Sequence, residues 1–147
     1  MPMVTTPASE GEPALSPDGR WLAYTSTESG KPEVYVRPFP DVGSAKWQVS
    51  LSGGNTPVWA HSGRELFYLD GNLAMVSVTV QLGAAFAVTG HRVLFPAQGY
   101  SYAGGYPTYD VTPDDSRFVM IRSVAPSAET EMVLIQHWAE ELKRQGR

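Results

Sequence analysis

Histidine is the side chain in this sequence best suited to act as a base or a metal ligand at neutral pH. The three histidines are His61, His91 and His137, and their wide spacing matches no metal or catalytic motif such as His-Glu-x-x-His. The sequence also has no Gly-x-Ser-x-Gly nucleophile elbow and no cysteine. We therefore expect no catalytic residue, no metal site and no cofactor. Folding could still gather such groups, so an enzymatic role stays open.

Adjacent carboxylates, Asp114 and Asp115, are the second group with ligand chemistry. Calcium takes six or more oxygen ligands, and no Asp-x-Asp-x-Asp loop is present to supply them. Asp after Pro113 is instead typical of a reverse turn, in which the carboxylate accepts hydrogen bonds from nearby backbone N–H groups. We interpret these carboxylates, and Asp18, as turn residues.

Tyrosine is concentrated in residues 98–110, around a Gly-Gly pair. Tyrosines on such a loop bring contact area at a small entropic cost. Two interpretations stay open: the ring cluster is a contact site for a peptide or ligand, or it covers the neighbouring structure. The tyrosines concerned are Tyr100, Tyr102, Tyr106 and Tyr109.

Short strands joined by tight turns are the elements that must position these side chains. The 147 residues include 14 Gly and 12 Pro, and only 18% are charged, which favours many turns over long helices. One pattern, a turn followed by an alternating apolar run, occurs three times. Equivalent positions are held by Pro17, His61 and Pro113, and further on by Leu22, Leu66 and Phe118. These positions are 44 and 52 residues apart, and such a spacing with four strand-like runs per unit predicts β-propeller blades.

We expect one domain, residues 1–147, made of units at about 10–54, 55–98 and 106–138. Residues 1–9 are expected to supply an outer strand, and 139–147 a C-terminal tail. Pro presets the backbone of each opening turn, Asp accepts from backbone amides, and Gly tolerates a positive φ. The turn residues are Pro17, Asp18, Gly19, Gly63, Pro113 and Asp114.

The repeats resemble the WD40-like (PD40) propeller repeat of TolB-like proteins, whose signature is a Ser-Pro-Asp-Gly turn before an aromatic-rich strand. The first copy matches at Ser16-Pro17-Asp18-Gly19 with Trp21 and Tyr24. The third matches at Thr112-Pro113-Asp114 with Phe118, and the second only at Gly63-Arg64 and Leu66-Phe67-Tyr68. The end of the chain also looks like the C-terminal propeller part of bacterial multidomain proteins, some with Ser/Thr kinase domains. The resemblance implies an all-β fold of about three four-stranded antiparallel blades and says little about function.

Charge and hydropathy limit the partners. The formal charge of −4 provides no basic surface for nucleic acid. The apolar runs are too short to span a bilayer and the start shows no signal peptide, so we expect no membrane insertion, with the compartment undetermined.

Three blades would form half of a six-bladed ring, because propellers close with about four to eight blades. We therefore expect a homodimer, in which residues 1–9 of one chain pair with the last strand of the other. A piece of a longer propeller is the alternative. The expected function is a non-catalytic scaffold that binds a protein or peptide partner. The other function considered is the regulatory or substrate-gating propeller of a larger enzyme, such as a kinase, peptidase or lyase.

Overall fold

A computed structural model describes residues 7–83, 85–100, 106–124 and 129–135, with the backbone alone given for residues 123, 124 and 129–135. This part of the chain forms eleven β-strands and no helix, so the all-β prediction is confirmed. It therefore contains no helix that could cross a membrane. Most of the expected outer strand (residues 1–6) and the whole tail lie outside the described residues.

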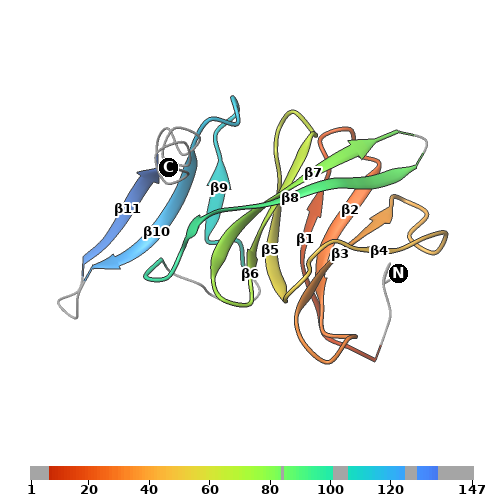
Figure 1. Cartoon of the computed structure of the whole chain (residues 1–147), viewed down its shortest axis with the longest axis horizontal. Coiled ribbons are helices and arrows are strands. Elements are labelled where there is room, and N and C mark those ends of the chain that lie inside the picture. Colours follow the sequence, from red (N-terminus) through yellow and green to blue (C-terminus); the bar gives the residue numbers. More distant parts are fainter. Residues whose placement is uncertain (1–6, 84, 101–105, 125–128, 136–147) are drawn as a thin grey trace.

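The strands form three antiparallel sheets that stand side by side (Figure 1). The first sheet contains β1 (Glu10–Leu15), β2 (Trp21–Ser26), β3 (Glu33–Pro38) and β4 (Trp47–Gln48) in that order. The second contains β5 (Gly54–Trp59), β6 (Glu65–Asp70), β7 (Ala74–Leu82) and β8 (Phe86–Pro96) in that order. The third contains β9 (Tyr109–Val111), β10 (Phe118–Val124) and β11 (Glu129–Ile135), with β10 in the middle.

The second sheet is covered on both faces, which explains the unbroken apolar run in β6. Leu66 and Tyr68 belong to a core shared with the first sheet. Phe67 and Leu69 belong to a core shared with the third sheet. Successive side chains of a strand point to opposite faces, so a strand between two other sheets must be apolar at every position. Burial between sheets therefore holds the three together.

The hairpin of β7 and β8 is longer than the sequence pattern predicts. The sequence pattern predicts a strand at 91–96, but β8 begins at Phe86, and its pairing with β7 continues through two register shifts. The extension carries Phe86 onto the first sheet, where its ring centroid lies 5.6 Å from that of Trp21 and 5.5 Å from that of Trp47. Packing against another sheet, which alternation within the strand does not reveal, stabilises this end of the hairpin.

The outer strand of the first sheet is shorter than expected. A strand at 45–51 is predicted, but β4 contains only Trp47 and Gln48. Beyond it the amide of Val34 donates to the Ser50 hydroxyl at 2.8 Å, and that hydroxyl donates to the Glu33 carboxylate. The Val49 amide also donates to the Val34 carbonyl at 2.8 Å, so backbone and side-chain hydrogen bonds together hold the chain to β3 where it leaves for the second sheet.

Candidate functional site

An open groove of about 610 Å³ lies where β1, β5 and β9, the first strands of the three sheets, come together. We call it the axial groove. Proline and aliphatic side chains make up most of its wall, with Trp59 and Tyr109 between them. The prolines and aliphatics are Pro13, Pro17, Pro57, Pro107, Ala14, Leu15, Val58, Val119 and Ile121. Concave, largely apolar sites with a few polar groups are the usual form of binding sites.

A buried carboxylate, Glu12, ties two of these strands together. Its Oε2 accepts a hydrogen bond from the Thr25 hydroxyl at 2.7 Å and another from the Thr56 amide at 2.6 Å. Only 8% of Glu12 is exposed, so both donors would lose their buried acceptor if the carboxylate were removed. Glu12 thus holds the first strand of the second sheet against the first sheet.

β1 and β5 each contain a bulge at the equivalent position, and both bulges border the groove. Glu12 and Thr56 both have a positive φ, 54° and 49°, and each is followed by a proline, Pro13 or Pro57. The pairing of each strand shifts register at this point. A positive φ is rare for residues other than glycine. Neither Glu12 nor Thr56 is among the site residues that the sequence predicts, although an X-Pro pair at equivalent places in two repeats marks both positions.

Two aromatic side chains link the first strands of neighbouring sheets, one between β5 and β1 and the other between β9 and β5. The Trp59 indole N–H donates to the carbonyl of Ala14 at 3.0 Å, and the Tyr109 hydroxyl donates to the carbonyl of Thr56 at 2.7 Å. Burial raises the pKa of Tyr109 well above its ordinary value, and the nearby charges of Glu12 and Asp110 add to the shift. Tyr109 therefore stays neutral and serves as a fixed donor.

The predicted turn residues lie at one end of the groove. Gly19 and Gly63 have φ values of 71° and 68°, and Asp115 takes the equivalent position of the third repeat at 56°. In the first turn the Ser16 hydroxyl donates to Asp18 at 2.7 Å. In the third, hydrogen bonds from the Thr112 hydroxyl and from Ser116 lower the pKa of Asp114 to about 2.

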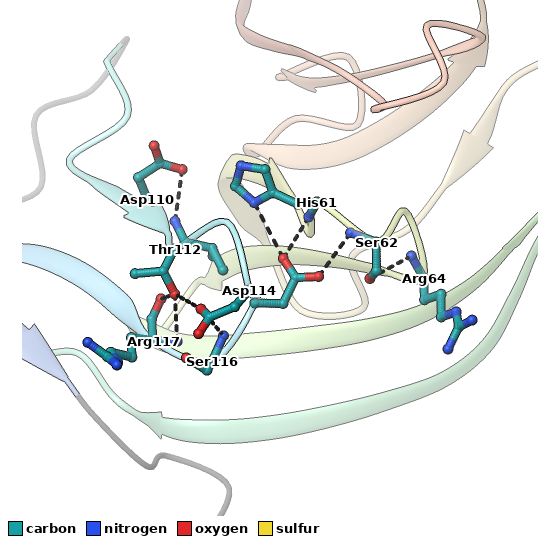
Figure 2. Close-up of polar contacts among 10 residues, drawn as sticks. His61, Ser62, Arg64, Asp110, Thr112, Asp114, Ser116 and Arg117 are labelled. Carbon is teal, nitrogen blue, oxygen red and sulfur yellow. Dashed lines mark hydrogen bonds and ion pairs between the residues drawn. The ribbon is translucent and has the colours of Figure 1, made fainter.

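Asp115 also joins the third turn to the second, through hydrogen bonds from His61 and Ser62, both of which are labelled in Figure 2. Its carboxylate accepts from the amide of His61 at 2.7 Å and from the amide of Ser62 at 2.9 Å. Burial opposes ionisation, but the hydrogen bonds from Ser62 and His61 outweigh it and lower the pKa of Asp115. The carboxylate therefore binds backbone donors of the second turn, 54 and 53 residues away along the chain.

The four tyrosines of the expected contact loop lie in different environments. Tyr100 is half-buried beside the core of the second and third sheets, whereas Tyr106 is 74% exposed. Tyr109 is buried in that core and reaches the groove wall. Tyr102 lies outside the described residues. A contact role for these tyrosines stays a prediction.

The histidines are not brought together in the described part of the chain. His61 lines the axial groove, while His91 lies on β8 with its Nε2 2.8 Å from the carbonyl of Val49. His137 lies outside the described residues. Among the residues the structure describes, no group of three or more His, Asp or Glu side chains could hold a metal ion.

No protein-family model matches the chain, and no curated protein matches it. Among solved structures, the acylaminoacyl peptidase of Pyrococcus horikoshii is similar with a TM-score of 0.61 and 12% identity. That similarity covers 90% of this chain and 24% of the peptidase. TolB from Acinetobacter baumannii is similar with a TM-score of 0.45 and 11% identity, over 92% of this chain and 43% of TolB. The chain thus spans less than half the length of either protein.

The sheets are blades of a β-propeller. Each begins with its innermost strand, β1, β5 or β9, and these strands border the axial groove. The predicted fold class is therefore confirmed. Structural similarity at sequence identities this low supports the fold but does not indicate an activity.

Proposed function

We propose that this chain is a non-catalytic propeller module that binds an extended segment of a partner protein in the axial groove. The groove carries the proposal: it has the volume of a ligand site, and prolines and aliphatic side chains form most of its wall. Such a wall suits apolar side chains of an extended peptide. The Glu12, Trp59 and Tyr109 hydrogen bonds hold the wall in place before a ligand arrives, which lowers the entropic cost of binding.

Capture of peptides from a degenerate library of acetylated, amidated octapeptides by the immobilised full chain tests this proposal. We expect Leu15→Ala to lower capture by roughly tenfold, because it removes apolar contact area from the groove. Leu51→Ala is the matched control, because Leu51 is 70% exposed and lies outside the groove, while Leu15 is 48% exposed. Equal capture by the two variants, measured by mass spectrometry, would contradict a ligand site in the groove.

We further propose that a second copy of the chain completes the ring. Within the described residues β11 pairs only with β10. An unpaired strand edge is a typical site of association, and two copies of a three-bladed chain form a symmetric ring.

The mass in solution tests this assembly. We expect light scattering coupled to size-exclusion chromatography to give the mass of two chains, stable over a dilution series. A monomer at all concentrations would exclude the two-chain ring.

A propeller part of a larger enzyme is the second candidate. It is favoured by the similarity to a peptidase of which the chain covers only 24%. A catalytic domain encoded in the same reading frame would support this candidate, and the missing blades would then belong to the same polypeptide.

A further inference from the structure

The ionisable groups of the axial groove are strongly biased towards negative charge. Among the described residues that line it, Glu12 and Asp110 are acidic and none is lysine or arginine. Asp110 is exposed on β9, opposite Val119 of β10, and one of its carboxylate oxygens accepts the amide of Val111 at 2.8 Å. It forms no ion pair with a cation of the described residues. A carboxylate of the wall is therefore available to a ligand.

Hydrogen-bond donors are scarce in the same wall. Pro13, Pro57 and Pro107 have no backbone N–H. The amide of Thr56 is bound by Glu12, and that of His61 by Asp115. Protein sites for anions are built from N–H groups that converge on the ligand, and among these five residues the backbone donors are absent or occupied. The groove is thus suited to a ligand that brings its own donors and a positive charge.

We propose that the axial groove selects a segment with apolar side chains and one basic side chain, arginine or lysine, whose cation pairs with Asp110. This inference rests on the proposed peptide-binding function and names the chemistry of its ligand. Leu15 and Val58 contact the apolar side chains, while Val119 and Ile121 lie on the same sheet face as Asp110. Partial burial of the ion pair under the peptide strengthens a charge-assisted hydrogen bond that would be weak in open solvent.

Three pools of acetylated, amidated octapeptides test the inference. The pools share degenerate apolar positions and differ only in a central arginine, glutamine or glutamate. We expect the immobilised full chain to capture the arginine pool about tenfold better than the glutamine pool, and the glutamate pool least. Added salt should reduce the preference, because it screens the pair.

Asp110→Asn should bring capture of the arginine pool down to that of the glutamine pool. The control Asp41→Asn removes the same charge from an exposed loop outside the groove and should keep the preference. Equal capture of the arginine and glutamine pools by the wild-type chain would overturn this inference and leave the proposed function standing. Failure to capture any pool above the Leu15→Ala background would overturn both.

Discussion

Replacing Phe118 with alanine is expected to lower the free energy of unfolding by about 3–5 kcal/mol, the usual cost of deleting a buried phenylalanine ring. Phe118 is completely buried. Its ring centroid lies 4.9 Å from that of Phe67 and 5.5 Å from that of Phe95, both in edge-to-face contact. Because these partners belong to the second sheet, the cavity would loosen the third sheet from the rest. Denaturant unfolding followed by circular dichroism measures the change.

Phe118→Leu is the control for this variant. Leucine retains most of the volume and loses the aromatic contacts, so the expected cost is about 1.5 kcal/mol or less. A Phe118→Ala variant as stable as the wild type would mean that the third sheet does not pack through this ring.

Replacing Glu12 with alanine is expected to cost about 3 kcal/mol of stability. The change leaves two buried donors, the Thr25 hydroxyl and the Thr56 amide, without their acceptor, at about 1–3 kcal/mol each. Glutamate and alanine both carry a Cβ, so the strain of the positive φ at residue 12 contributes little to the difference. Denaturant unfolding again measures the loss.

Two further variants isolate the hydrogen bonds of Glu12. Glu12→Gln retains an acceptor oxygen and should lose less than half as much stability as Glu12→Ala. In a double-mutant cycle, Thr25→Val and Glu12→Ala should be less than additive, because they remove the same bond. Strict additivity would show that the Thr25 contact contributes nothing.

The fold class could be predicted from local features of the sequence. Turn residues such as Pro17 and Gly19 and the alternation in β2 act over a few positions, so they can be recognised without knowing what surrounds them. The limits of the outer strands could not be predicted in this way. β8 extends to Phe86, which packs on Trp21, and β4 ends before Ser50, whose hydroxyl accepts from the Val34 amide. Both contacts involve residues far away along the chain.

Most residues of the candidate site could not be identified from the sequence. Tyr109 was recognised as one of a group of tyrosines, but its partner, the carbonyl of Thr56, lies 53 residues away. Asp115 was recognised as a turn residue, whereas its bonds to the second turn could not be foreseen. The role of Glu12 could not be predicted, because a glutamate before a proline is common in sequences and only the structure shows that this one is buried.

By itself the sequence determined the repeat, its turns and the antiparallel blades, since these follow from backbone preferences and period-two burial within short segments. Only the tertiary structure decided that β1, β5 and β9 enclose a groove with an exposed carboxylate, Asp110, and few free donors. Those properties arise where strands from different repeats meet, and each contact between them joins residues about 44 or more positions apart.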